Sequence, residues 1–498
     1  MYKNQSNDMT KVYIITMISL GLGILFDYLF YDKIPGISFP LYILLVIAGL
    51  FIIARITQKQ INKEVFTPIV LLVFFSTMIF VRSNDLLVFL DIVTSLILLL
   101  VIAEISFFSK MKKLSLQDFL KIFFLPFKFF QPAFQTLSNI FLLRGAKEDR
   151  KILSQILRGI IMTIPALFVF LLLFSSADLI FQKYVSEILS IENEMELFLR
   201  FLLILIVTIV FIGAYTYSFR EKGETIMPQS SNKHAVEQIE SSIILGSINI
   251  LFSIFIIVQM TYLFGGESNI SAQGFTYAEY ARRGFFELIA VAVISLFLLL
   301  ITEKYAIKKE AEHTLSFKIL STALITQVIL IMVSAFIRLS LYEEAYGFTT
   351  LRLYSHAFII LLAFIFCLLF YKIFQDDRES AFILRVLISI AFFLAFMNLL
   401  NPDAFIARRN IERFERIGKI DIDYLGSLSD DAMPIIINVL DIPDEDMRKS
   451  LSLILYQHTQ NRDSFYYSQW QSLNLSRIRA NGILKSKSYK LEAYKNLQ

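Results

Sequence analysis

Three segments of the chain gather arginine, tyrosine and carboxylate side chains of the kinds that recognise charged or sugar ligands. They read TYAEYARRGFFEL at 276–288, RLSLYEEAYGFTTLRLYSH at 338–356 and NPDAFIARRNIERFER at 401–416. A guanidinium offers a bidentate fork to phosphate or carboxylate, and a phenol both stacks and hydrogen-bonds. The candidate ligand-binding residues are Tyr277, Glu279, Tyr280, Arg282, Arg283 and Glu287 in the first segment, Arg338, Tyr342, Glu343, Glu344, Tyr346, Arg352 and Tyr354 in the second, and Asn401, Asp403 and Arg408 in the third.

Spacing within the first two segments indicates how these side chains would be presented. If the first segment is helical, Glu279, Arg283 and Glu287 recur every four residues and form one ladder of alternating charge. Glu287 would then lie within the lipid boundary, where an ionised carboxylate needs a partner such as Arg283. Gly347 can break a helix in the second segment, which would then re-enter the membrane or cap the helices beside it.

The same three segments also fit a structural role. Tyrosine and arginine are common at membrane boundaries, where they anchor the ends of helices. On that interpretation the segments supply helix caps, juxtamembrane anchors and ion pairs that lock loops together. The residue types alone leave both interpretations open.

A few polar residues fall deeper within apolar stretches. They are Asp91, Asn249, Gln259 and Gln327. An aspartate inside a membrane is a functional hypothesis by default, but Asp91 is only about five residues from the end of its stretch, so its side chain could also reach the interface. Asn249 and Ser253 share a helix face, and residues of this kind more often bridge helices than hold ions.

Several classes of chemistry find no support in the sequence. Cys367 is the only cysteine and the four histidines have no metal-ligand spacing, so neither an intramolecular disulfide nor a metal site is expected. No nucleotide-binding, zinc-protease or serine-elbow motif occurs, and no cofactor is expected. With 47 basic and 43 acidic residues, the charge is too balanced for a nucleic-acid binder. Whether the protein is an enzyme stays open.

The composition calls for a lipid solvent. Hydrophobic residues make up 56% of the chain and charged residues 18%, whereas an ordinary globular chain has about 45 to 50% and roughly 25%. A helix needs about 20 mostly apolar residues to cross a hydrocarbon core of about 30 Å. Eleven stretches qualify and predict an all-α polytopic membrane protein with about 11 transmembrane helices; they are 12–31, 38–54, 66–82, 86–107, 153–175, 197–219, 241–264, 284–302, 318–338, 356–374 and 382–400.

One further apolar region is predicted to lie along the membrane rather than across it. Between Lys110 and Lys151, apolar stretches are interrupted by Pro126, Pro132, Lys121 and Lys128. Charges that recur so often are typical of an interfacial amphipathic segment. If the part at 114–143 crossed instead, the protein would have twelve spans.

Basic residues predict the orientation. The connection at 55–65 carries Arg55, Lys59 and Lys63, and the one at 108–151 carries nine basic residues, so both are predicted to be cytoplasmic. The connection at 176–196 has one basic residue, Lys183, among acidic ones and is predicted to be external. With eleven spans, the N-terminus is cytoplasmic, the C-terminus is extracytoplasmic, and all three polar segments share the external face.

The last hundred residues change to the composition of a soluble segment. In LGSLSDDAMPIIINVLD, a helix start at Ser429 or Asp430 precedes an apolar face at Met433, Ile436, Ile437 and Leu440, which predicts a small helical module. The chain is therefore divided into an N-terminal four-helix membrane region at 1–109, a cytoplasmic or interfacial segment at 110–152, a seven-helix membrane core at 153–400 and a soluble extracytoplasmic module at 401–498.

Three motifs carry a resemblance to a known family. At TYAEYARRGFFEL, YEEAYGFTTLRLY and IDIDYLGSLSDDAMP the sequence resembles a bacterial multi-pass membrane family catalogued as domain of unknown function 4173. The likeness runs from about residue 144 to 440. It implies a location in the bacterial inner membrane and adds no catalytic residues.

Three functional hypotheses follow. The first is an envelope protein that binds a lipid-linked, glycan or protein partner at its external face, because polar residues gather there. The second is a secondary transporter, which would need a midplane site and usually an internal repeat; no repeat is visible. The third is a sensor that couples the external module to the interfacial segment. The lipid bilayer is the one partner that composition requires, and the oligomeric state is left open.

Overall fold

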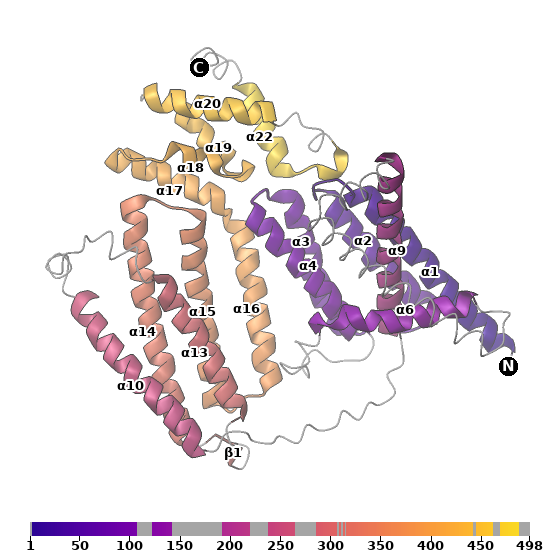
Figure 1. The fold of residues 1–498 in the computed structure, drawn as a ribbon, viewed down its shortest axis with the longest axis horizontal. Helices are drawn as coiled ribbons and strands as arrows, with labels where there is room; N and C mark the ends of the chain where they lie inside the picture. Colours follow the sequence, from indigo (N-terminus) through magenta and orange to yellow (C-terminus); the bar gives the residue numbers. More distant parts are fainter. Residues whose placement is uncertain are drawn as a thin grey trace, which may run out of the picture. The chain divides into compact units, whose positions relative to one another are not determined.

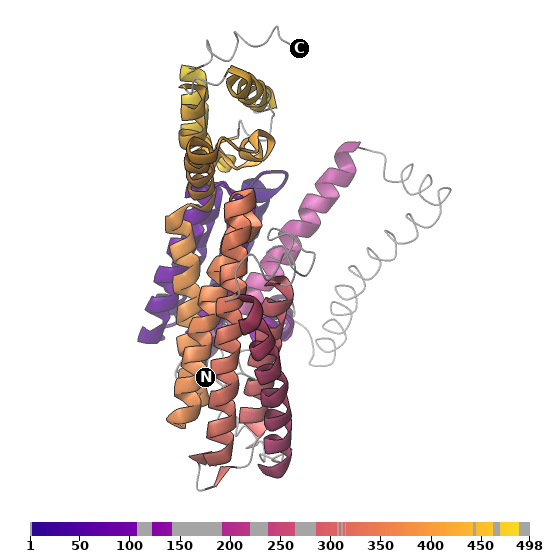
Figure 2. The same cartoon turned by 90° about the vertical axis from the view of Figure 1, so that its left-hand side faces the viewer.

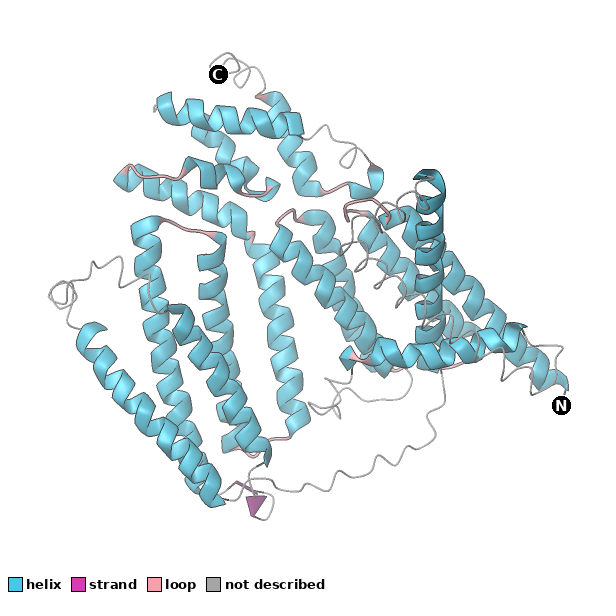
Figure 3. Cartoon of the chain, in the orientation of Figure 1, coloured by secondary structure: helices cyan, strands magenta, loops and turns pink. Residues whose placement is uncertain are grey.

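The protein is almost entirely helical in the part of the chain that the structure describes. The structure is a computed structural model, and it describes residues 2–106, 122–141, 192–219, 238–263, 285–305, 308–309, 312–313, 315–441, 445–461 and 469–487. Helices account for nearly all of this, as Figure 3 shows. A pair of two-residue strands, β1 (Lys308–Lys309) and β2 (Glu312–His313), joins antiparallel in one connection. The predicted all-α fold is confirmed.

Ten helices in the described residues are long and apolar enough to cross a membrane. Each coincides with one of the predicted stretches, so the chain is a multi-pass membrane protein. The remaining predicted stretch, 153–175, lies outside the described residues. The predicted division into four regions stays a prediction.

The chain separates into two compact units, and both are discontinuous in sequence. The first unit comprises residues 1–81, 88–223 and 462–475, and the second comprises 82–87, 224–461 and 476–498. The described helices of the first unit are α1 (Tyr2–Phe30), α2 (Ser38–Ile56), η1 (Lys63–Val65), α3 (Phe66–Val81), most of α4 (Asp85–Ile105), α6 (Leu125–Phe141), α9 (Glu192–Phe219) and η5 (Trp470–Ser472).

The core of the first unit is built from α1, α2, α3, α4 and α9. Apolar side chains such as Leu22, Ile53, Leu72 and Ile105 are buried there, together with Tyr215 of α9. Large apolar residues on the outward faces, for example those of α3 and α9, are exposed, as expected for helices that lie in lipid.

Helix α6 corresponds to the predicted interfacial segment. Figure 1 shows it lying crosswise to α9, near the C-terminal end of that helix. Phe129 and Phe134 are buried, whereas Phe123, Phe124 and Phe127 are exposed, so one face packs on α9 and the other faces outward. No membrane-spanning candidate falls within the described residues of this segment, 122–141.

Close packing of α1 on α9 depends on a small residue and one ion pair. A Cβ atom added at Gly23 would lie 2.3 Å from Thr208 Oγ1 and 2.8 Å from the Ile204 carbonyl oxygen. Toward the ends of the same two helices, the guanidinium of Arg200 donates to Asp27, with Nη2 2.7 Å from Oδ2. A buried carboxylate in an apolar setting needs such a partner, so this pair fixes the alignment of α1 with α9.

Replacing Gly23 by alanine should push α1 and α9 apart and lower the melting temperature in detergent by several degrees. The added methyl group meets the backbone of α9, which cannot rotate away as a side chain can. Gly21→Ala is the matched control, because a Cβ there meets nothing within 4 Å and alanine improves helix propensity. Equal melting temperatures for the two variants would contradict close packing at Gly23.

In its described residues, the second unit holds five long apolar helices and the C-terminal module. The long helices are α10 (Gln238–Leu263), α13 (Phe285–Tyr305), α14 (Leu315–Tyr346), α15 (Thr350–Phe374) and α16 (Glu379–Leu400). The module comprises α17 (Pro402–Ile417), α18 (Ile422–Ser427), η3 (Asp430–Ala432), α19 (Met433–Ile436), η4 (Ile437–Asp441), α20 (Glu445–Asn461) and most of α22 (Leu475–Ser486). Figures 1 and 2 both show the module at the ends of α14, α15 and α16 where the α14–α15 turn lies.

Ion pairs mark the opposite end of these helices. Lys372 of α15 pairs with Glu303 of α13, and both side chains are buried. Lys318 pairs with Asp376, and Lys304 Nζ lies 3.5 Å from Glu379 Oε1. Because a charge that leaves water must be compensated, these pairs lock the helix ends together on one side of the unit.

The module has its own apolar core. The predicted face at Met433, Ile436, Ile437 and Leu440 is buried there, although a 3-10 turn, a single α-turn and a second 3-10 turn replace the one continuous helix that the pattern suggested. Leu353 of α15 is buried in the same cluster. The module is therefore packed against a membrane helix of its own unit.

Candidate functional site

Most of the first predicted polar segment lies outside the described residues. Tyr277, Glu279, Tyr280, Arg282 and Arg283 are in this group, so the predicted charge ladder stays a prediction. Glu287 is described, in the first turn of α13, and it is exposed. Since α13, α14 and α15 alternate in direction, Glu287 lies toward the same end of the second unit as the α14–α15 turn.

The second and third segments come together where the module meets that turn. Asn410 of α17 accepts from the Phe348 N–H at 2.8 Å and donates to the Phe348 carbonyl oxygen at 2.9 Å. Arg413 donates to the carbonyl oxygens of Glu344 and Ala345, and the Tyr424 hydroxyl accepts from the Thr350 N–H at 2.6 Å. Backbone N–H and C=O groups at the ends of α14 and α15, which have no partner within their helices, thus form hydrogen bonds with side chains of the module.

Two arginines stand close together in this contact. Arg352 stacks over the Tyr342 ring at 4.0 Å and donates to the Gly347 carbonyl oxygen. Burial lowers the pKa of Arg413 from its ordinary value, and the positive charges of Arg352 and Arg416 lower this pKa further. Gly347 has φ +85°, and a Cβ there would lie 2.8 Å from Asn410 Oδ1, so glycine is required at this turn.

Glu343 of α14 is directed toward α15. It is buried, and its Oε1 lies 3.1 Å from His356 Nδ1. On the other side of the ring, His356 Nε2 lies 3.1 Å from Ser340 Oγ. Three side chains from α14 and α15 therefore form a continuous polar chain inside the helix pair.

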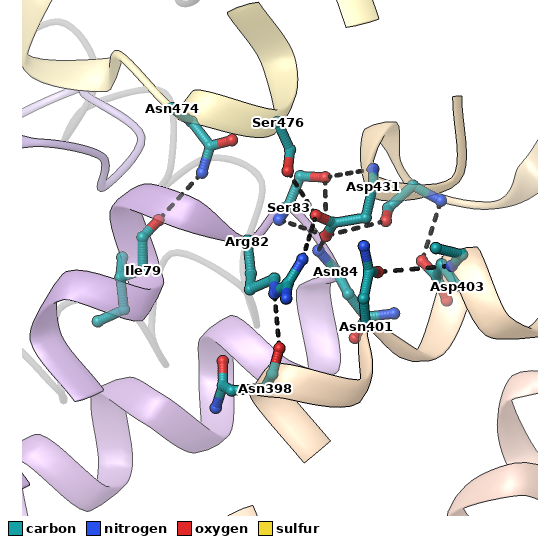
Figure 4. A network of polar contacts seen from close by, with 12 residues as sticks. Ile79, Arg82, Ser83, Asn84, Asn398, Asn401, Asp403, Asp431, Asn474 and Ser476 are labelled. Atoms are coloured by element: carbon teal, nitrogen blue, oxygen red, sulfur yellow. Dashed lines mark hydrogen bonds and ion pairs between the residues drawn. The ribbon is translucent and has the colours of Figure 1, made fainter. Parts of the chain in front are cut away.

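A second polar network surrounds Asp431, as Figure 4 shows. The Asp431 carboxylate accepts from the backbone N–H groups of Ser83 and Asn84 at 2.7 and 3.1 Å and from the Ser476 hydroxyl. Arg82 Nη1 lies 3.6 Å from the same carboxylate, and Arg82 Nε donates to the Asn398 carbonyl oxygen. This buried carboxylate joins three stretches of the second unit that are far apart in sequence.

The remaining predicted residues take structural positions or face outward. Asn401 adopts φ +55° between α16 and α17 and caps α17, while Asp403 accepts from the Ser429 N–H. The Tyr354 hydroxyl lies 3.5 Å from Asn84 Oδ1. Arg408, Glu344 and Tyr346 are exposed, and Arg338 is half-buried in α14.

Of the four polar residues predicted within the spans, Asp91, Asn249 and Gln259 are buried and Gln327 is half-buried. Gln327 of α14 donates to the Asn249 carbonyl oxygen and to Ser253 Oγ, and Asn249 donates to Leu320 O, so these residues bridge α10 and α14. Asp91 is fully buried in α4, and Gln259 is buried in α10. The bridging that Asn249 and Ser253 suggested is present.

Sequence reasoning singled out Asn410 as part of the third polar segment but missed three residues that organise these contacts, namely Asp431, Arg413 and His356. Asn410 and Arg413 lie within the third predicted segment, and His356 is the last residue of the second. The turn at Gly347 is the signal that could have revealed His356, because it folds His356 back toward Glu343. Asp431 had no such signal, because its partners Ser83 and Asn84 are 348 and 347 residues away.

The first unit contains an apolar cavity of about 660 Å³ between α1, α2, α4, α6 and α9. Its wall follows α9 from Ile206 to Ser218, twelve residues or roughly 18 Å at 1.5 Å per residue. The hydroxyls of Tyr215 and Ser218 donate to carbonyl oxygens of neighbouring helices. Lys33, in the α1–α2 turn, is among the residues that line the cavity, and its ammonium group lies over the Tyr28 ring.

Comparison with known proteins places these features in a family. The family model described as Domain of unknown function (DUF4153) matches residues 69–439, well over half of the chain. The chain belongs to this family. No curated protein and no solved structure matches it.

The family assignment corrects one expectation from the sequence. The resemblance to domain of unknown function 4173 was right in its kind, a family of unknown function, and wrong in its number. The DUF4153 match begins earlier than residue 144, so it includes most of α3 and all of α4. Ser340, Glu343, His356 and Asp431 fall within it, whereas the cavity residues of α1 and α2 do not.

Replacing Asp431 by alanine should destabilise the protein by about 3 to 5 kcal/mol, because it leaves Arg82 and several buried donors without their acceptor. We expect faster cleavage of the module in limited proteolysis and a lower melting temperature. Asp423→Ala is the matched control, since this aspartate is exposed, and its effect should stay within about 0.5 kcal/mol. Equal protease resistance of the two variants would show that Asp431 does not hold the module.

Proposed function

We propose that this membrane protein binds an anionic, lipid-linked component of the bacterial envelope in the apolar cavity of its first unit. The observation that carries the proposal is the combination of a long apolar wall with one lysine at its end. The wall suits a hydrocarbon chain and the ammonium group suits a phosphate or carboxylate.

The dimensions of the cavity support a chain-like ligand. Its extent of roughly 18 Å along α9 is slightly more than half of a hydrocarbon core of about 30 Å, and half of the core is the depth that one lipid chain occupies in a bilayer. The tyrosine and serine hydroxyls of the wall donate hydrogen bonds to the protein backbone. A hydrocarbon chain in the cavity would therefore leave none of these hydroxyls without a hydrogen-bond partner.

Lys33 supplies the charge for the head group. Its ammonium group donates to the Tyr28 carbonyl oxygen and lies 5.1 Å from the centre of the Tyr28 ring. Neither contact neutralises the charge, and within the described part of the chain Lys33 is in no ion pair. An anionic head group would provide the missing negative charge.

The polar segments of the second unit fit this function less well. Arg352, Arg413 and Asn410 already bond to the backbone of the α14–α15 turn. The interhelical bonds of Asn249 and Gln327 likewise favour a bridging role over a solute site, which weakens the transporter hypothesis.

Filling the cavity should displace the lipid. We expect Val207→Trp to reduce phospholipid retained through detergent purification at least fivefold by native mass spectrometry, because the indole occupies the space of a chain. Val70→Trp is the matched control, since Val70 is exposed on α3.

Lys33→Gln should lower the retention of anionic lipids and leave the retention of zwitterionic lipids unchanged. Identical lipid content in all four proteins would overturn the proposal.

The proposed ligand would enter from the extracytoplasmic side if the N-terminus is cytoplasmic, as the basic connections predict. Cys367 is the only cysteine, so Cys367→Ser gives a background for single reporters. In intact cells, a membrane-impermeant maleimide should label Arg408→Cys, and it should label Gln60→Cys only after permeabilisation. Labelling of both positions under the same condition would refute this orientation.

A further inference from the structure

The polar chain inside the α14–α15 pair has the order of a nucleophile, a base and an acid. Ser340 Oγ lies 3.1 Å from His356 Nε2, and His356 Nδ1 lies 3.1 Å from Glu343 Oε1. Both distances are within the hydrogen-bond reach that nucleophilic catalysis requires, and the third group orients the base. We propose that Ser340, His356 and Glu343 form a catalytic relay that cleaves acyl esters at the bilayer surface, an activity beyond the lipid binding of the first unit.

Local structure explains why these side chains meet. Phe336, Ser340 and Glu343 follow one face of α14 at spacings of four and three residues. The Gly347 turn reverses the chain and brings His356 of α15 opposite that face. The Phe336 ring packs edge-on against the imidazole at 4.4 Å between ring centres, so the base is held in one orientation by apolar packing and by Glu343.

The tautomer of His356 decides whether the relay can act. With Glu343 ionised, Nδ1–H donates to the carboxylate and Nε2 is left as a proton acceptor, 3.1 Å from Ser340 Oγ and 3.3 Å from the Phe336 carbonyl oxygen. Ser340 Oγ also lies 2.9 Å from the Phe336 carbonyl oxygen, a common partner of a helical serine. The hydroxyl proton therefore has two acceptors in reach, and attack on a substrate requires transfer to Nε2.

Depth in the bilayer selects the substrate class. Lys318, paired with Asp376, marks one end of α14, and Ser340 lies 22 residues further along, roughly 33 Å at 1.5 Å per residue. A hydrocarbon core of about 30 Å that starts beside Lys318 ends just short of Ser340. Acyl ester linkages of membrane lipids lie at that boundary, between the hydrocarbon chains and the polar head groups.

The reaction balances without a cofactor. Ser340 Oγ attacks the ester carbonyl carbon while its proton passes to His356 Nε2, and Glu343 stabilises the imidazolium. The C–O bond to the alcohol then breaks, and the alcohol leaves with the proton from Nε2. Water attacks the acyl-serine in turn, releases the carboxylic acid and restores Ser340.

An activity probe tests the relay directly. The full-length protein in nanodiscs of mixed zwitterionic and anionic phospholipid is treated with a fluorescent fluorophosphonate, and hydrolysis of a medium-chain p-nitrophenyl ester is measured in parallel. Wild type should be labelled and Ser340→Ala should not. His356→Gln and Glu343→Gln should slow ester hydrolysis by about 10² to 10⁴.

Ser389→Ala is the matched control. Ser389 is also a helical serine that donates to the carbonyl oxygen four residues earlier, in this case that of Arg385, and it is not part of the relay. It should keep both labelling and hydrolysis, and melting temperatures in detergent show which variants are folded. Wild type that labels no better than heat-unfolded protein, or Ser340→Ala that labels like wild type, would overturn the proposal.

Discussion

A polar group that leaves water must find its partner inside the protein, and this requirement determines where most charged side chains of the chain lie. Within spans, backbone groups meet it by forming helices. Side chains meet it in pairs: Asp27 with Arg200, Glu303 with Lys372, and Glu343 with His356. Each pair links two helices, so the same contacts that neutralise a charge also set the alignment of the spans.

The two units use this rule differently. In the first, the hydroxyls of Tyr42, Tyr215 and Ser218 bond to neighbouring backbones, which leaves an apolar cavity with a lysine at its end. In the second, side chains of the module hydrogen-bond to the backbone of the α14–α15 turn, and Glu343 bonds to His356 inside the helix pair. A search for function by residue type therefore pointed to the most polar surface, whereas the space for a ligand is in the least polar part.

Sequence alone gave the spans well, because hydrophobic length is a local property. Ten predicted stretches recur as helices, and the apolar positions of the module are buried as their spacing suggested. A contact between residues that are far apart in the sequence leaves no pattern near either residue. Nothing near Asp431 indicates that Ser83 and Asn84 donate to it, and nothing near Ser340 shows that an imidazole lies opposite until the turn at Gly347 is taken into account. The cavity was also invisible, since its lining resembles any other apolar helix face.

The network around Asp431 has a consequence for the order in which the protein is made. Ser83 and Asn84 leave the ribosome 348 and 347 residues before the carboxylate that accepts from them. At about 5 to 20 residues per second, this delay is roughly 17 to 70 s. Throughout that time the early turn must keep its N–H groups in water or on a temporary acceptor. Final assembly of the second unit therefore waits for the last part of translation, and in a nascent chain stopped before Asp431 the N–H groups of Ser83 and Asn84 would lack this acceptor.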